Sequence, residues 1–197
     1  MNLIDIRRNL AYRITNPVVG ILSKSGITPN ALTLINLALN IVAAYVIATG
    51  HLLIGGVLVL VSGLFDLLDG ALARFTKKTT KFGAILDSTV DRISEAAILC
   101  GLLIWYAPQE EASLKIVLIF AVLIGSFLVS YIRARAEGLG WQCQVGLFTR
   151  AERVIVLAIG LLINQIFIAL CVLAVFVFIT VVQRLVYLWK QGKIKGE

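Results

Sequence analysis

Charged residues are scarce in this chain, and that scarcity is its most restrictive property. Asp, Glu, Lys and Arg make up 15% of the 197 residues, hydrophobic residues make up 59%, and the mean hydropathy is +0.95. A composition this apolar excludes an ordinary soluble domain. We therefore predict an all-α integral membrane protein in which residues 1–197 form a single membrane domain.

Histidine and cysteine are also scarce. The chain has one histidine, His51, and three cysteines, Cys100, Cys143 and Cys171, which are far apart in sequence. Their spacing fits neither a metal site nor a disulfide framework, and two of them lie in apolar runs where cysteine behaves as a small hydrophobic residue. A metal site in this chain would therefore depend on oxygen ligands.

Long apolar tracts recur at a length that suits a bilayer. A helix needs about 20 apolar residues to cross a hydrocarbon core of about 30 Å. The last tract, 154–187, is too long for one span and is interrupted by Asn164-Gln165, which predicts two helices joined by a tight turn. We predict six transmembrane helices, near 31–49, 52–73, 83–106, 113–136, 151–164 and 166–189.

The distribution of positive charge predicts how these spans are oriented. With six spans, nearly all Lys and Arg residues fall on one side, and the other side has only Lys115 beside Glu110, Glu111 and His51. An excess of Lys and Arg marks the cytoplasmic face, so we expect a multi-pass protein of the cell membrane with both termini in the cytoplasm. The basic residues should also attract anionic membrane lipids, and we expect no nucleic-acid partner.

The first residues predict a separate short helix. Leu3, Ile6, Leu10 and Ile14 recur at helical spacing, with charged residues elsewhere around the wheel. This pattern indicates an amphipathic helix over 2–14 that lies on the cytoplasmic interface, and it lacks the long apolar core of a signal peptide.

Four aspartates lie at the polar ends of two apolar segments. Helical spacing places Asp66 and Asp69 on one face of the second predicted span, and Asp87 and Asp91 on one face of the third. Two carboxylates about 4 Å apart repel by roughly 4 kcal/mol at an effective dielectric constant near 20, so cations must compensate them. Carboxylate oxygens without His or Cys favour Mg²⁺ or Mn²⁺, and one or two such ions beside Arg74 would suit a pyrophosphate.

Two other classes of protein remain open at this point. A cation-coupled transporter would use intramembrane carboxylates, although it usually places them near the midplane in broken helices, often within inverted repeats. A non-catalytic scaffold, in which the aspartates only pair with nearby Lys and Arg residues, leaves their regular spacing unexplained.

The spacing of the aspartates also carries a family resemblance. The pattern D-x-x-D-G-x-x-A-R, eight further residues, then G-x-x-x-D-x-x-x-D, runs from Asp66 to Asp91 and resembles the signature of the CDP-alcohol phosphotransferase family. The resemblance implies that an acceptor hydroxyl attacks the phosphorus bonded to the lipid alcohol of a CDP-linked lipid and releases CMP. It further implies a homodimer in which Asp66, Asp69, Asp87 and Asp91 hold two metal ions, with Asp91 also the general base.

The same resemblance implies where the CDP-lipid binds. Thr28-Pro29-Asn30 has the pattern of a helix start, which leaves backbone N–H groups free near the membrane surface. The positions that resemble the nucleotide-binding residues of the family are Pro29, Asn30, Ala31, Leu32, Gly70, Arg74 and Thr80.

Arginines of the later spans point to a phosphorylated acceptor, because a guanidinium matches phosphate oxygens with two parallel hydrogen bonds. The segments S-Y-x-R-A-R-A-E, R-A-E-R and V-V-Q-R resemble the branch of the family that uses inositol phosphate. This resemblance implies that CDP-diacylglycerol or CDP-archaeol is the donor, and that the acceptor is held by Ser130, Arg133, Arg135, Arg153 and Arg184. Glycerol 3-phosphate remains the alternative acceptor, since the number of arginines does not separate the two.

Overall fold

The computed structural model describes residues 19–20, 22–23, 26–76 and 79–195. All regular elements in this part of the chain are helices, which confirms the all-α prediction. They are α2 (Pro29–Ala48), α3 (Leu52–Phe75), α4 (Lys81–Tyr106), α5 (Ser113–Gly138), α6 (Arg150–Leu162) and α7 (Ile166–Lys195). The interfacial helix predicted over 2–14 lies outside the described residues.

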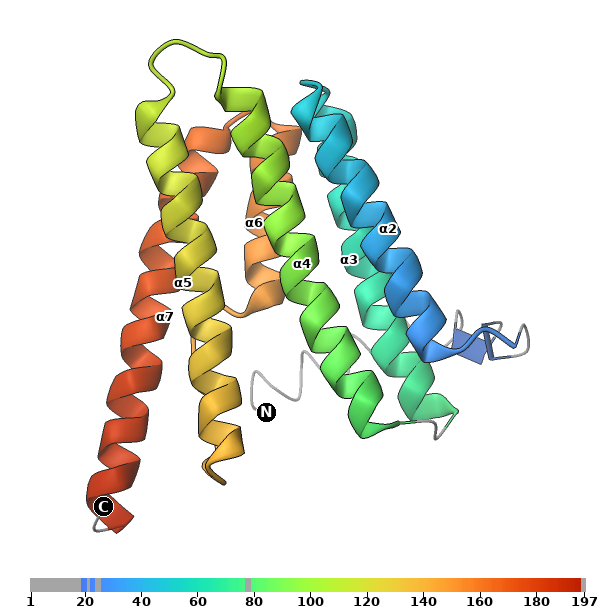
Figure 1. Ribbon diagram of the computed structural model, residues 1–197, viewed down its shortest axis with the longest axis vertical. Coiled ribbons are helices and arrows are strands. Elements are labelled where there is room, and N and C mark those ends of the chain that lie inside the picture. Colours follow the sequence, from blue (N-terminus) through green and yellow to red (C-terminus); the bar gives the residue numbers. More distant parts are fainter. Residues whose placement is uncertain (1–18, 21, 24–25, 77–78, 196–197) are drawn as a thin grey trace.

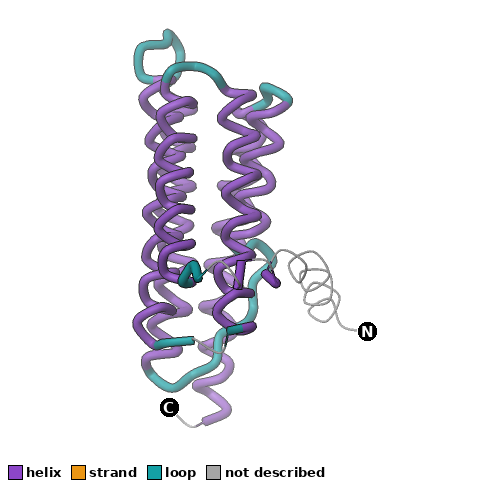
Figure 2. Tube along the Cα trace, turned by 90° about the vertical axis from the view of Figure 1, so that its right-hand side faces the viewer, coloured by secondary structure: helices purple, strands orange, loops and turns teal. Residues whose placement is uncertain are grey.

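The helices run side by side in two groups (Figure 1). Helices α2, α3 and α4 pack together on one side, α5 and α7 pack together on the other, and α6 contacts both α3 and α7. The α2–α3, α4–α5 and α6–α7 connections lie at one end of the bundle, whereas the α3–α4 connection and the end of α7 lie at the other (Figures 1 and 2). The aspartates therefore belong to the end at which α3 finishes and α4 begins.

Four of the described helices, α2, α3, α5 and α7, are long and apolar enough to cross a membrane. Helix α6 has only 13 residues, which corresponds to about 20 Å at 1.5 Å per residue. Helix α4 has 26 residues, but its first half is interrupted by Asp87, Asp91, Arg92 and Glu95. The described part of the chain is thus a multi-pass membrane protein, and its two helices of weaker spanning character, α4 and α6, both carry charged side chains in their first turns or first half.

Local sequence explains where the helices begin and end. Thr28 caps α2 by accepting a hydrogen bond from the Ala31 N–H at 3.2 Å, and Thr80 caps α4 by accepting one from the Gly83 N–H at 2.9 Å. Both caps satisfy backbone donors that a helix start leaves free. Asn164 has a φ of 55°, a left-handed conformation that asparagine tolerates, and it forms the turn between α6 and α7 where the sequence predicts a break.

Polar and small residues hold α2 against its neighbours. The Ser62 hydroxyl on α3 donates a hydrogen bond to Asn40 Oδ1 at 2.9 Å, and the Asn40 side chain donates to the Asn36 carbonyl at 2.9 Å. On α4, a Cβ added to Gly101 would lie 2.4 Å from the carbonyl oxygen of Ala44. Glycine at this position therefore allows the backbones of α2 and α4 to approach closely.

We expect Gly101→Ala to destabilise the protein by about 1 to 3 kcal/mol, because the clash is with backbone and the two helices must separate. Gly138→Ala is the matched control, since a Cβ at that position meets nothing within 4 Å. Thermal unfolding in detergent should show a lower midpoint for Gly101→Ala and an unchanged or higher one for Gly138→Ala. Equal midpoints for the two variants would contradict this account of the α2–α4 contact.

Candidate active site

Three of the four predicted aspartates converge in the structure. Asp66 and Asp69 on α3 and Asp87 on α4 each offer a carboxylate oxygen, and these oxygens lie within 4.8 Å of one another. Asp69 is buried and the other two are partly exposed. Three hard oxygen donors at such distances fit a magnesium or manganese ion, and they would repel one another without a cation.

Asp69 is held by a residue that sequence reasoning missed. Thr33, one turn into α2, is buried, and its hydroxyl lies 2.9 Å from Asp69 Oδ2, to which it donates a hydrogen bond. A fixed donor restricts the carboxylate to one orientation. The clue available in the sequence is that Thr33 lies one helical turn after Pro29, which is itself a predicted nucleotide-site residue.

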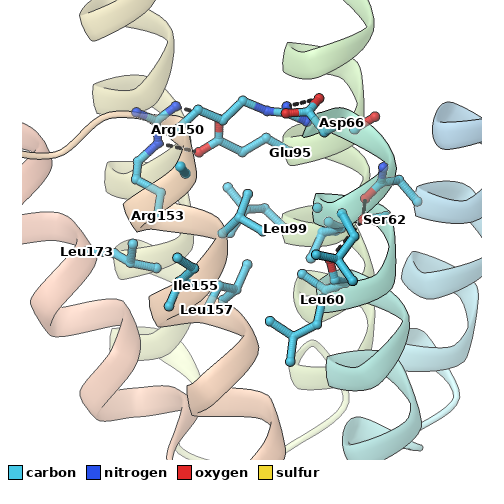
Figure 3. Close-up of a pocket in the computed structure, with 18 of the residues that line it drawn as sticks. Leu60, Ser62, Asp66, Glu95, Leu99, Arg150, Arg153, Ile155, Leu157 and Leu173 are labelled. Carbon is cyan, nitrogen blue, oxygen red and sulfur yellow. Dashed lines mark hydrogen bonds and ion pairs between the residues drawn. The ribbon is translucent and has the colours of Figure 1, made fainter. Parts of the chain in front are cut away.

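Asp91 is not among the three clustered aspartates. Its Oδ1 lies 2.8 Å from Arg150 Nη1, and the same nitrogen also forms an ion pair with Asp66. Arg150 is the first residue of α6, so its guanidinium connects α6 with both α3 and α4, as its contact with Asp66 in Figure 3 illustrates. The sequence places Arg150 on the charged side of the membrane but does not identify these two partners.

A cavity of about 170 Å³ lies between the starts of α2 and α4 and the end of α3. Five of the seven predicted nucleotide-binding residues line it: Pro29, Asn30, Gly70, Arg74 and Thr80. Asp69 and Asp87 also line it, so the cavity reaches the carboxylate cluster. We call this cavity the nucleotide pocket.

The other two predicted residues of that set, Ala31 and Leu32, do not line the nucleotide pocket. Leu32 is only 2% exposed and belongs to a small apolar cluster with Leu72. The Ala31 N–H is already used by the Thr28 cap. Ala31 and Leu32 therefore serve the helix cap and the apolar packing. Their neighbours in sequence, Asn30 and Thr33, are the residues that line the nucleotide pocket.

The lack of a side chain at Gly83 keeps the nucleotide pocket open. A Cβ at this position would lie 2.9 Å from Thr80 Oγ1 and 3.2 Å from Asn30 Oδ1. A side chain here would displace two pocket-lining groups and fill part of the space between α2 and α4. The motif has glycine at this position because Thr80 and Asn30 approach its backbone too closely for a side chain.

A second polar cavity, of about 540 Å³, lies between α4, α5, α6 and α7. Four of the five predicted acceptor residues line it: Ser130, Arg133, Arg153 and Arg184. Arg135 does not line this cavity and is exposed on α5. Asp87, Asp91 and Arg150 also line this space, which we call the arginine cavity.

Each arginine of the predicted acceptor set that lines the cavity has a partner in the protein. Arg153 pairs with Glu95 through two bonds of 2.7 and 2.8 Å, and Arg133 pairs with Glu137 at 2.8 Å. Arg184 donates to the backbone carbonyls of Val145, at 3.0 Å, and Val129. Glu95 was not predicted, although it continues the stripe of acidic residues one turn after Asp91.

An apolar cavity of about 180 Å³ lies beside the charged groups, between α3, α4 and α6. Figure 3 shows the side chains of Asp66, Glu95, Arg150 and Arg153 gathered at one end of it, with Leu60, Ile155 and Leu157 farther along. A cavity with one charged end and apolar walls is suited to an amphipathic molecule.

The fold and the site define a helical membrane protein with clustered carboxylates where two polar cavities meet. Residues 26–186 match the model of the CDP-alcohol phosphatidyltransferase family, and the chain belongs to that family. It is therefore a transferase of phospholipid biosynthesis, and the transporter alternative is set aside.

Two relatives within the family are synthases of inositol phosphate lipids. The phosphatidylinositol phosphate synthase of Mycobacteroides abscessus is 37% identical over 91% of this chain and 86% of its own length. The archaetidylinositol phosphate synthase of Pyrococcus horikoshii is 39% identical over 83% of this chain and 84% of its own length.

Solved structures agree with these relatives. The phosphatidylinositol phosphate synthase of Mycobacterium tuberculosis with CDP-DAG bound superposes with a TM-score of 0.83 at 36% identity, covering 90% of this chain and 94% of that one. A structure of the same enzyme with manganese and citrate gives a TM-score of 0.82 at 35% identity, covering 89% and 88%.

Proposed function

We propose that this chain transfers a phosphatidyl or archaetidyl group from a CDP-linked lipid to an inositol phosphate, 1D-myo-inositol 3-phosphate, in a magnesium-dependent reaction. The products are phosphatidylinositol phosphate, or its archaeal ether-lipid counterpart, and CMP. The observation that carries the proposal is the place of Asp87. It belongs to the carboxylate cluster and lines both the nucleotide pocket and the arginine cavity, so donor and acceptor would meet at the metal site.

The donor would occupy two of the cavities. Its cytidine and pyrophosphate fit the nucleotide pocket, where Asn30, Arg74 and Thr80 offer polar groups. The first part of one lipid chain would enter the apolar cavity that begins beside Asp66 and continues between α3 and α6. This arrangement would bring the phosphorus attached to the lipid alcohol close to the carboxylates.

We propose that Asp66, Asp69, Asp87 and Asp91 hold two Mg²⁺ ions, with Mn²⁺ as a substitute. When bound, such ions offset the negative charge that develops on the pyrophosphate during transfer. The protein itself contributes the Thr33 hydroxyl, which fixes the Asp69 carboxylate, and the Arg150 guanidinium, which offsets part of the negative charge of Asp66 and Asp91.

Asp91 is proposed as the general base. It lines the arginine cavity, so its carboxylate faces the space assigned to the acceptor, and it can accept the proton of the attacking hydroxyl. The Arg150 guanidinium lies 2.8 Å from this carboxylate and forms an ion pair with it. Arg133, Arg153 and Arg184, with Ser130, would hold the phosphate of the acceptor at the other side of the same cavity.

The proposal also covers the membrane topology and the assembly of the protein. We infer six membrane spans and the interfacial helix 2–14 in the plasma membrane, with both termini and the active site in the cytoplasm, and a homodimer as the assembly. The support is that the α3–α4 connection, the end of α7 and the carboxylate cluster share one end of the bundle (Figure 1). The basic residues Lys81, Arg133 and Lys193 are at that end as well, as the positive-inside rule requires.

A CMP-release assay tests the reaction and separates the two acceptors. Purified protein in detergent receives CDP-diacylglycerol, Mg²⁺ and either 1D-myo-inositol 3-phosphate, glycerol 3-phosphate, serine or no acceptor. We expect CMP release with inositol phosphate, loss of that release in EDTA, and recovery with added Mg²⁺ or Mn²⁺. Release with glycerol 3-phosphate alone would replace the proposed acceptor, and no release with any acceptor would contradict the assignment.

A further inference from the structure

The ion pair between Glu95 and Arg153 is the most buried one among the described residues. The Arg153 side chain is 4% exposed and that of Glu95 is 11% exposed, whereas the other pairs have side chains at least 20% exposed. Arg153 Nε donates to Glu95 Oε1 at 2.7 Å, and Arg153 Nη2 donates to Oε2 at 2.8 Å. Two parallel bonds of this kind fix both the position and the plane of the guanidinium.

The pair leaves part of the guanidinium available. An arginine has five N–H donors, and the contacts with Glu95 use the Nε donor and one donor on Nη2. Nη1 makes only a long contact of 3.5 Å with the Phe148 carbonyl. The second donor on Nη2 and one donor on Nη1 therefore remain for a ligand in the arginine cavity, which both Glu95 and Arg153 line.

We propose that Glu95 is a positioning residue for the acceptor, acting through Arg153. It holds the guanidinium edge-on so that its free N–H groups face the phosphate of the acceptor. This inference rests on the proposed function, because it assigns the phosphate-binding role to Arg153. Other carboxylates, including Asp91, line the same cavity and would be the alternative partners of Arg153 in the absence of Glu95.

Because Glu95 is negatively charged, its charge and its positioning role predict opposite changes in acceptor affinity when it is removed. The arginine cavity is lined by five arginines, Arg92, Arg133, Arg150, Arg153 and Arg184, and by four carboxylates, Asp87, Asp91, Glu95 and Glu137. A carboxylate beside a phosphate site weakens anion binding through its charge alone. Removing Glu95 would therefore improve acceptor binding if charge were its only contribution, and it would impair binding if orientation of Arg153 dominates.

The experiment compares Glu95→Gln, Glu95→Asp, Arg153→Gln and the double variant Glu95→Gln/Arg153→Gln with the wild-type protein. We expect Glu95→Gln to raise KM for inositol phosphate about 10-fold and to leave KM for CDP-diacylglycerol within twofold. In the Arg153→Gln background, Glu95→Gln should cause no further rise, because residues that act as one unit are not additive. Glu110→Gln, an identical charge change at the opposite end of the bundle, should alter neither constant.

Several outcomes would overturn the assignment. An unchanged or lower KM for inositol phosphate in folded Glu95→Gln would show that orientation is not its role, and an equal effect in both backgrounds would show that it does not act through Arg153. If Glu95→Gln does not fold, Glu95→Asp decides, since it keeps the charge but shortens the reach to Arg153 and should raise KM about threefold or more.

Failure of the proposed function gives a different result. In that case the wild-type protein releases no CMP with inositol phosphate, whatever residue is at position 95. The positioning role is then decided by calorimetric titration of inositol phosphate into wild-type and Glu95→Gln protein in the presence of CDP-diacylglycerol and Mg²⁺. Weaker binding to Glu95→Gln would support it, and equal or absent binding to both would overturn it.

Discussion

Asp91→Asn is expected to lower turnover by about 10²- to 10⁴-fold, the range associated with loss of a positioned general base. Asparagine has nearly the same shape as aspartate but cannot accept the proton of the acceptor hydroxyl. Its amide oxygen can still lie beside the Arg150 guanidinium, with which Asp91 Oδ1 forms an ion pair at 2.8 Å, so the contact between α4 and α6 is retained. The variant should therefore fold and bind CDP-lipid.

The measurement is the rate of CMP release at saturating CDP-diacylglycerol and inositol phosphate, with a thermal-shift titration of CDP-lipid on the same preparation. A large drop in turnover with a nearly normal CDP-lipid response would support the role of Asp91 as base. If turnover stays within threefold of wild type, another group must accept the proton. If CDP-lipid binding is lost as well, Asp91 acts chiefly in holding the metal and donor.

Arg150→Gln is expected to tighten Mn²⁺ binding by about 10- to 100-fold. The Arg150 guanidinium contacts carboxylate oxygens of both Asp66 and Asp91, which are two of the proposed metal ligands. Two unit charges about 4 Å apart interact by roughly 4 kcal/mol at an effective dielectric constant of 20, so removing one cation leaves the carboxylates freer to bind another. The same change should lower the unfolding temperature in EDTA, because the carboxylates then lack a positive partner.

Electron paramagnetic resonance titration of Mn²⁺ measures the affinity, and thermal unfolding with EDTA or excess Mg²⁺ measures the stability. Lys115→Gln removes one positive charge at the opposite end of the bundle and should alter neither quantity. Weaker Mn²⁺ binding in Arg150→Gln would contradict the idea that Arg150 and the metal compete for Asp66 and Asp91. It would show instead that the guanidinium holds these carboxylates in the geometry that the metal requires.

The helices and the aspartate motif were accessible to sequence reasoning because both depend on local periodicity. Apolar runs predict helices wherever they occur, and the i, i+3 and i, i+4 spacings place Asp66 with Asp69, and Asp87 with Asp91, on common faces. The caps at Thr28 and Thr80 are local as well. The interruption at Asn164 could be predicted because a turn residue splits a tract too long for one helix.

The partners of the arginines could not be predicted in the same way. The sequence places Arg150 and Arg153 at the start of a helix on the charged side, but which carboxylates they meet depends on how α6 packs against α3 and α4. In the structure, Arg150 reaches Asp66 and Asp91, which are 84 and 59 positions earlier in the chain, and Arg153 reaches Glu95.

Composition and periodicity thus established a helical membrane protein, the two acidic faces and the family motif, since each follows from residues within a few helical turns of one another. Tertiary packing decided that three aspartates converge while Asp91 pairs with Arg150, that Thr33 orients Asp69, and that Ala31, Leu32 and Arg135 do not line the cavities. The physical reason is that helical spacing determines which side chains share a face, whereas the rotation and close approach of each helix determine what that face meets.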